Sequence, residues 1–160
     1  MASPKELFYK NGLAFQCQRC SACCRHEPGF VFLSQVDLDA LCKETKLEED
    51  EFIAVYGRWV PWEGELEILS LKEKANNDCI FWGDEGCAEY ASRPYQCSSY
   101  PFWGSILRDK KTWEDCARDC PGIGKGAIIA GDVIESLLDE RSNHPYITRD
   151  RSFDGVDTRI

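Results

Sequence analysis

Apolar positions recur at helical spacing in two neighbouring segments near the middle of the chain. An N-cap signature at Ser34–Asp37 precedes residues that share one helix face: Leu38, Leu41 and Cys42. The segment Lys46–Tyr56 repeats this spacing and is followed by Gly57, a residue type that often terminates helices. The pattern therefore predicts two consecutive short helices.

The pattern changes after the second helix. Residues 59–71 alternate between apolar and polar positions and predict extended structure. A short strand is predicted over Cys79–Trp82, ahead of a turn at Gly83–Gly86. Residues 97–120 show little periodicity, so we expect mostly loop there, with one short strand near Trp103–Leu107.

The two ends of the chain differ in character. A capping box at Ser3–Glu6 predicts a short opening helix that stops at Asn11-Gly12. Residues 128–141 give the clearest helical pattern of all. Residues 142–160 hold few apolar side chains and predict a loosely attached tail. The expected fold is a small, loop-rich α+β domain over residues 1–141, followed by that tail.

Composition narrows the possible partners. The 160 residues carry a net charge of −9 and no basic stripe, which argues against nucleic acid and against anionic membranes as main partners. No apolar run is long enough to span a bilayer. Leu, Ile, Val and Phe make up only about 22% of the residues. Such a thin core suggests that something besides apolar burial helps to hold the fold, and a protein partner stays open.

Ten cysteines are the outstanding feature of the composition. A disulfide scaffold and a metal site both explain such a number. The segment Met1–Lys10 lacks the apolar stretch and cleavage site of a secretory signal. We therefore expect a reducing, cytoplasmic location, where disulfides are rare and clustered thiols usually hold metal. The metal site is the favoured interpretation.

Four of these cysteines fall within eight residues and carry the strongest chemical signal. Two-residue gaps separate Cys17, Cys20 and Cys23, and such gaps let successive thiolates converge on one centre. Cys24 directly follows Cys23, and neighbouring residues seldom complete one tetrahedron together. The adjacent pair therefore suggests two nearby metals or a multi-iron cluster.

The remaining cysteines match no standard zinc finger. We expect loops that carry Cys79, Cys87, Cys97 and Cys120 to close on the N-terminal cluster. Cys42 is expected in the core, because it shares an apolar helix face. Cys116 stays open between a ligand and a spare thiol. His26 and His144 are further possible ligands.

Several motifs together resemble one known family. They run in order from Phe15–Arg25 through Cys79–Trp82, Gly86–Tyr90, Arg93–Cys97, Tyr100–Phe102 and Cys120–Gly122. This combination resembles the YkgJ-type cysteine-cluster family, also called CxxCxxCC. The resemblance implies a zinc- or iron-chelating domain. Residue by residue, it implies these metal ligands: Cys17, Cys20, Cys23, Cys24, Cys79, Cys87, Cys97 and Cys120.

The identity of the metal stays open. Three local thiolates with a remote Cys120-Pro121 are ferredoxin-like and favour iron, with a 4Fe–4S cluster as one form it could take. Four-cysteine zinc sites tolerate irregular spacing equally well. Either metal would add folding energy that the thin core lacks.

Three hypotheses for function follow from these observations. The first is a metal-binding protein in electron transfer, metal handling or an accessory role. The second is an enzyme similar to the flagellin lysine N-methylase, a larger relative with an iron–sulfur cluster. The third is an interaction module that zinc holds together. No Ser–His–Asp set and no glycine-rich nucleotide motif after a strand is evident, so a protein without its own catalytic residues is favoured.

Overall fold

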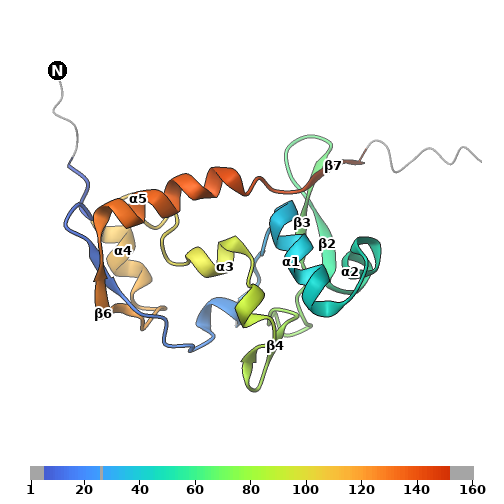
Figure 1. Ribbon diagram of the computed structural model, residues 1–160, viewed down its shortest axis with the longest axis horizontal. Coiled ribbons are helices and arrows are strands. Elements are labelled where there is room, and N and C mark those ends of the chain that lie inside the picture. The colour runs from blue at the N-terminus through green and yellow to red at the C-terminus, as the bar shows by residue number, and fades with distance from the viewer. Residues whose placement is uncertain (1–5, 26, 152–160) are drawn as a thin grey trace, which may run out of the picture. The chain divides into compact units, whose positions relative to one another are not determined.

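A computed structural model describes residues 6–25 and 27–151. The chain forms two compact units, each assembled from separate stretches of sequence. Unit 1 comprises Met1–Cys24 and Ser99–Asn143, and unit 2 comprises Arg25–Ser98 and His144–Ile160. Helices and short sheets occur in both, which confirms a mixed α and β fold (Figure 1). Neither unit ends at residue 141, so a single 1–141 domain stays a prediction.

Unit 2 is built on a three-stranded antiparallel sheet with order β2-β3-β7. Strands β2 (Gly57–Pro61) and β3 (Leu66–Leu71) form a hairpin. Strand β7 (Thr148–Asp150) pairs with the other edge of β3. Helices α1 (Gln35–Thr45) and α2 (Glu49–Tyr56) precede the sheet and confirm the two predicted helices, with Gly57 as the C-cap of α2.

The start of α1 is fixed by a reciprocal capping box. The Ser34 hydroxyl accepts the Asp37 N–H at 3.2 Å, and the Asp37 carboxylate accepts the Ser34 N–H at 2.8 Å. The other carboxylate oxygen of Asp37 accepts the N–H of Tyr95 at 2.8 Å. Tyr95 begins helix α3 (Tyr95–Ser99), so one buried carboxylate satisfies backbone donors of two helices.

The core of unit 2 lies between these helices and the sheet. It is formed by Leu33, Leu38, Leu41, Phe52, Leu69, Leu71 and Phe81, none more than 7% exposed. Cys42 packs against it, as predicted from its helix face. The short hairpin β4 (Trp82–Gly83) and β5 (Gly86–Cys87) follows Phe81 and confirms the predicted turn. A 3-10 turn, η2 (Tyr90–Ser92), leads into α3.

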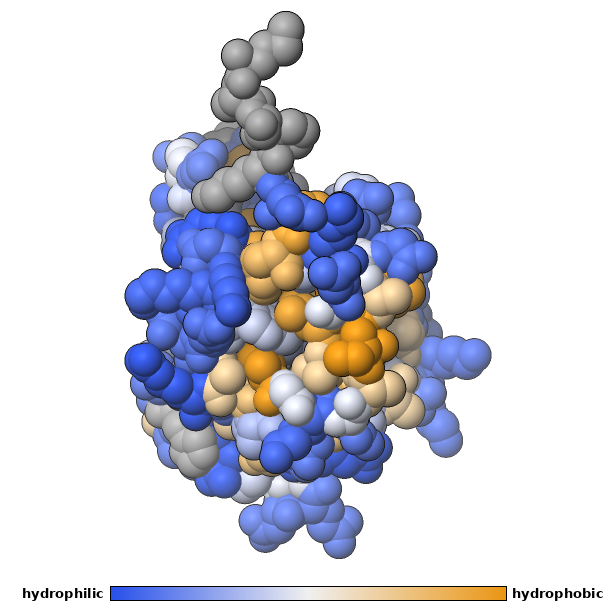
Figure 2. All heavy atoms as spheres, turned by 90° about the vertical axis from the view of Figure 1, so that its left-hand side faces the viewer, coloured by the Kyte–Doolittle hydropathy of each residue, from blue (hydrophilic) through white to orange (hydrophobic). Residues whose placement is uncertain are grey.

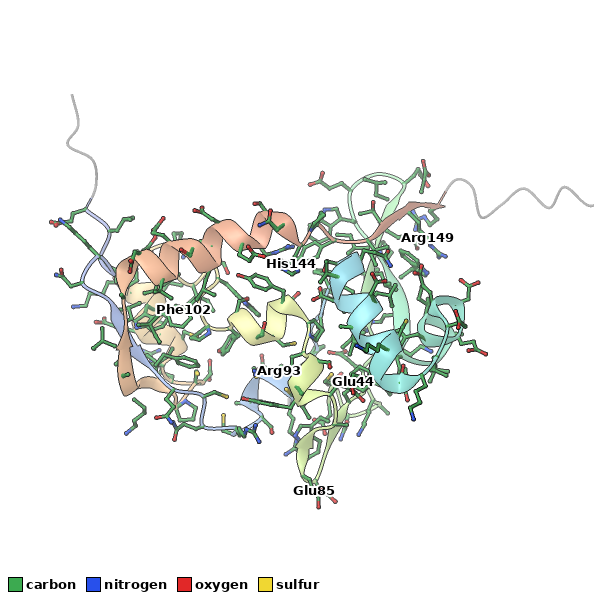
Figure 3. The ribbon with its side chains drawn as sticks, in the orientation of Figure 1. Glu44, Glu85, Arg93, Phe102, His144 and Arg149 are labelled. Atoms are coloured by element: carbon green, nitrogen blue, oxygen red, sulfur yellow. The ribbon has the colours of Figure 1, made fainter. Side chains whose placement is uncertain are left out.

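Unit 1 is centred on an antiparallel ribbon of β1 (Leu13–Phe15) and β6 (Ile123–Ile129). Helix α5 (Gly131–Glu140) follows β6, and helix α4 (Lys110–Cys116) comes earlier in the chain. Two 3-10 turns are η1 (Ala22–Cys24) and η3 (Arg141–Asn143). The buried core is Tyr9, Phe102, Leu107, Trp113 and Ile134. Figure 3 shows Phe102 in this core, beside α4 and α5.

Two predicted strands are wrong or displaced. Cys79 makes only an isolated bridge to Glu73, and the strand starts at Trp82, because a turn closes between the Trp82 N–H and the Cys79 carbonyl. Residues 103–107 form turns: the N–H groups of Ile106 and Leu107 both donate to the Trp103 carbonyl at 2.9 Å. The expected loop over 97–120 also contains α4, which a side-chain cap from Asp109 starts.

The predicted elements at both ends need correction too. The last helix starts at Gly131, three residues late, because Ile128 and Ile129 are paired with β1. Within the expected tail, residues 148–150 are a strand of the unit 2 sheet, so that stretch is not loosely attached. The first described residues form a turn that ends at Gly12, not a helix. Residues 1–5 and 152–160 lie outside the described residues.

The surface of unit 1 carries apolar side chains on the side of β6 and α5, which Figure 2 turns toward the viewer. The large apolar residues of unit 1 that are exposed are Leu7, Ile128 and Val133. Over the described residues, no helix combines the length and hydrophobicity needed to cross a lipid bilayer.

The capping box predicts a measurable loss on substitution. Ser34→Ala removes the acceptor of the Asp37 N–H, and we expect a loss of about 1–2 kcal/mol in the free energy of unfolding. The matched control is Ser136→Ala, an exposed serine within α5 whose hydroxyl donates to the Asp132 carbonyl. That change should stay within about 0.5 kcal/mol. Chemical denaturation measures both, and equal effects would contradict the role given to Ser34.

Candidate metal centre

The Cys17 turn begins where β1 ends. The Gln16 N–H donates to the Gly122 carbonyl at 3.1 Å, one residue before Cys17. The chain then turns back, and the Arg19 N–H donates to the Cys17 sulfur at 3.4 Å. Arg19 and Ser21 take left-handed φ values of 51° and 65°, which this tight turn requires. The result is a compact Cys17–Cys20 turn with both side chains exposed.

Cys23 and Cys24 lie side by side in η1, with their sulfur atoms 3.9 Å apart. Cys23 is exposed and Cys24 half-buried. Thiolates this close would repel each other, so a bound cation is a natural way to stabilise both as anions.

Cys120 is the buried thiol of unit 1, only 8% exposed. Burial raises the pKa of this thiol, while the backbone N–H groups of Gly122 and Ile123 lower it. Negative charge on Cys116 and Cys20 raises the pKa further. The backbone places Cys116 beside Cys120, because the Cys120 N–H donates to the Cys116 carbonyl at 3.0 Å.

Cys79 has the same local arrangement in unit 2. Burial raises the pKa of its thiol, and the Phe81 backbone N–H lowers it. Negative charge on Cys87 also raises the Cys79 pKa, since β5 brings Cys87 nearby. Both thiols pack against the core of unit 2.

Backbone N–H groups two positions later act on three of these thiols in the part of the chain that the structure describes. The Arg19 N–H donates to the Cys17 sulfur at 3.4 Å, and the Phe81 and Gly122 N–H groups lower the pKa of the Cys79 and Cys120 thiols. Such bonds favour the thiolate over the thiol. Thiolates are the form in which cysteine binds a metal.

Cys116 has a different partner. The Tyr100 hydroxyl lies 3.3 Å from its sulfur, at hydrogen-bond distance. Burial strongly raises the pKa of Tyr100, and so do this bond and the negative charge of Cys116, Cys120 and Cys23. The phenol therefore stays protonated and can donate to sulfur. Spacing alone could not have found Tyr100, because only the fold brings it to Cys116.

A cation lies beside the Cys79 turn. The Arg25 guanidinium stacks 3.6 Å from the centre of the Trp82 ring, and its Nε donates to the buried Asp78 carboxylate at 3.3 Å. Among the described residues, the Trp82 indole Nε1 is buried without a hydrogen-bond acceptor. An anionic sulfur is a suitable acceptor for such a donor, so this arrangement fits a thiolate-bound metal.

Arg93 and Glu85 mark the rim of this region of unit 2. The Arg93 guanidinium lies over the Tyr90 ring at 3.7 Å, and its Nε donates to the Tyr90 carbonyl at 2.9 Å. This contact braces the loop ahead of Cys97, which lies half-buried on α3. Glu85 stands at the exposed tip of the β4–β5 hairpin (Figure 3).

The structure divides the predicted ligands between its units. Unit 1 contains Cys17, Cys20, Cys23, Cys24 and Cys120, and unit 2 contains Cys79, Cys87 and Cys97. Among the described residues, no group of three or more His, Cys, Asp or Glu side chains lies close enough together to bind a metal ion. The eight-ligand assignment thus stays a prediction.

The two histidines were also predicted as possible metal ligands. His26 lies outside the described residues. His144 stacks on the Tyr95 ring, with ring centres 4.4 Å apart. Its Nδ1 is 3.5 Å from the Ser34 hydroxyl.

A comparison with protein families shows to which family the chain with these cysteine motifs belongs. A family model described as "CxxCxxCC: Putative zinc- or iron-chelating domain" matches residues 16–121. The chain belongs to the CxxCxxCC family. The match covers most of the chain and includes every predicted ligand from Cys17 to Cys120, so this family's cysteine pattern extends over both units. No solved structure matches the chain.

The backbone contact between Gln16 and Gly122 predicts a steric requirement. A Cβ at position 122 would meet the Gln16 carbonyl oxygen at 2.4 Å and the Phe15 ring at 2.9 Å. We expect Gly122→Ala to cost about 1–3 kcal/mol of stability, because backbone must move. The control is Gly104→Ala in the same unit, where a Cβ meets nothing within 4 Å. Thermal unfolding that is equally affected in both variants would contradict this close approach.

Proposed function

We propose that this CxxCxxCC protein binds zinc or iron through its cysteine thiolates, with ligands drawn from Cys17, Cys20, Cys23, Cys24, Cys79, Cys87, Cys97 and Cys120. The observation that carries the proposal is the donation of the Arg19 N–H to the Cys17 sulfur at 3.4 Å, together with backbone N–H groups that lower the thiol pKa at Cys79 and Cys120. A core thiol needs no such donors. A metal-bound thiolate does, because they orient the sulfur and stabilise its charge.

Burial of the thiols also supports metal binding, although its effect on the thiol pKa is opposite to that of the N–H groups. It raises the pKa of Cys79 and Cys120, so that without metal both stay protonated at neutral pH. Metal binding must then displace these protons. Affinity should therefore rise with pH and fall on acidification, as expected for a site of buried thiols.

The buried Trp82 indole supports a metal near Cys79 and Cys87. Its N–H lacks an acceptor among the described residues, and an unsatisfied buried donor costs about 1–3 kcal/mol. A bound thiolate or sulfide would relieve that cost. The adjacent Arg25, held by Asp78, would offset negative charge at such a centre.

Both metals of the family description remain part of this proposal. The ferredoxin-like spacing of Cys17, Cys20 and Cys23 with Cys120-Pro121 supports iron. Electron transfer or metal handling in the reducing cytoplasm would suit such a centre. Purification without oxygen or chelators, followed by metal analysis and a visible spectrum, distinguishes the two. Broad visible absorption with bound iron indicates a cluster, and a colourless protein with zinc indicates a thiolate site.

Metal content should separate a ligand from a core thiol. We expect wild-type protein to carry at least about one zinc or iron per chain. Cys20→Ser should lose metal. Cys42→Ala should keep it and lose only packing energy, up to a few kcal/mol. Elemental analysis of the three proteins is the measurement. Metal-free wild type would refute the proposed function, and equal loss in both variants would refute the core assignment of Cys42.

Metal removal should loosen the cysteine-bearing turns. Residues 17–24, 79–88 and 116–123 contain few core side chains, so metal–thiolate bonds should supply much of their order. We expect faster amide exchange there after chelation under reducing conditions. Helices α1 and α5, which carry buried core residues, should persist. Hydrogen exchange of holo and apo protein tests this, and unchanged protection of the turns would show that metal does not order them.

A further inference from the structure

Cys116 lies outside the cysteine pattern that the family resemblance carries over, yet it stands close to a thiol within that pattern. It is the last residue of α4, and three residues separate it from Cys120. The Cys120 N–H donates to the Cys116 carbonyl at 3.0 Å, which curls the chain so that both residues stay near each other. A gap of three residues falls within the range of cysteine pairs that chelate one zinc ion.

The β1–β6 ribbon places this pair opposite another one. Phe15 pairs with Ile123, and the Gln16 N–H continues the ladder to the Gly122 carbonyl. Because the strands are antiparallel, the chain that leaves β1 and the chain that enters β6 meet at the same end of the ribbon. Cys17 and Cys20 lie on the first, and Cys116 and Cys120 lie on the second. The close approach of Gly122 to Gln16 keeps the two turns adjacent.

Local contacts in unit 1 fit a thiolate at each pair. The Arg19 N–H donates to the Cys17 sulfur at 3.4 Å, and the Ile123 N–H donates to the Cys120 carbonyl at 3.2 Å and closes the Cys120 turn. The Tyr100 hydroxyl lies against Cys116 at 3.3 Å. Tyr100 also packs edge-on against Trp103, with ring centres 5.0 Å apart, which fixes the direction of its hydroxyl. Cys116 thus has a donor of its own, as a metal-bound sulfur requires.

We propose that Cys17, Cys20, Cys116 and Cys120 form a four-thiolate metal site at the end of the β1–β6 ribbon, with Cys116 as a ligand and Tyr100 as the residue that positions its sulfur. This inference rests on the proposed function and assigns ligands within unit 1. Cys17 and Cys20 are both exposed. Because no core packing holds these exposed side chains, rotation about their side-chain bonds would bring their sulfurs toward the Cys116–Cys120 pair in the proposed site. Four sulfur ligands in a tetrahedron suit zinc or a single iron.

The test measures zinc binding to full-length reduced protein. Cys116→Ser should weaken binding at one site by about 100-fold, since one of four thiolates is lost. Cys42→Ser is the matched control, a half-buried cysteine of the other unit, and should bind as wild type does. Cys23→Ser tests the competing ligand of the same unit. Substituting Co²⁺ for zinc reports the number of thiolates, because sulfur-to-cobalt absorption should fall in Cys116→Ser.

A second measurement works on wild-type protein and needs no folded variant. Alkylation read by mass spectrometry should modify Cys116 in metal-free protein and spare it once zinc is bound. Equal modification in both states, or full zinc affinity in Cys116→Ser with loss in Cys23→Ser, would overturn this inference while leaving the proposed function standing. Absence of any zinc or iron binding by wild type would instead remove the proposed function.

Tyr100→Phe separates positioning from packing. It removes the hydroxyl beside Cys116 and keeps the ring against Trp103. We expect zinc affinity to fall by about tenfold, as for other partners that orient a ligand, and the pH dependence of binding to shift upward. Unchanged affinity and pH dependence would remove Tyr100 from the site.

Discussion

The ladder between β1 and β6 is the constraint on which the rest of unit 1 depends. It joins a strand near the start of the chain to one near its end, and the core of Tyr9, Phe102, Trp113 and Ile134 closes beside it. The same ladder brings the Cys17 and Cys120 turns to one end of the ribbon. The hydrophobic core and the arrangement of the cysteine turns in this unit therefore both depend on the pairing of β1 with β6.

Opposed influences on the thiols give the candidate site its chemical character. Burial disfavours the thiolate at Cys79 and Cys120, while backbone N–H groups favour it. Without a cation the two influences leave a protonated, buried thiol. In the proposed metal-bound state the cation would favour the thiolate far more strongly than either influence, and the backbone N–H groups would act in the same direction as the cation.

Sequence reasoning succeeded where the signal was local. Ser34 and Asp37 predict the start of α1 because capping depends on residues three apart, and Cys42 is placed in the core by helical periodicity. It failed where pairing partners are distant. Ile128 and Ile129 fit a helical pattern in the sequence but pair with β1 in the structure. Thr148–Asp150 has the composition of a tail but pairs with β3. The contact of Tyr100 with Cys116 depends in the same way on tertiary structure. The cysteine motifs themselves could be recognised from their spacing in the sequence.

The interleaved connectivity of the two units has a consequence for how the protein is made. Strand β1 must wait for β6, and the sheet of unit 2 is completed only when β7 joins β3. Neither unit can finish folding until almost the whole chain has left the ribosome. The Cys17–Cys24 segment is synthesised early and spends that interval as a flexible, thiol-rich peptide. Under the proposed function, metal capture by this segment would compete in time with chain pairing, and the supply of metal during synthesis would then affect folding yield.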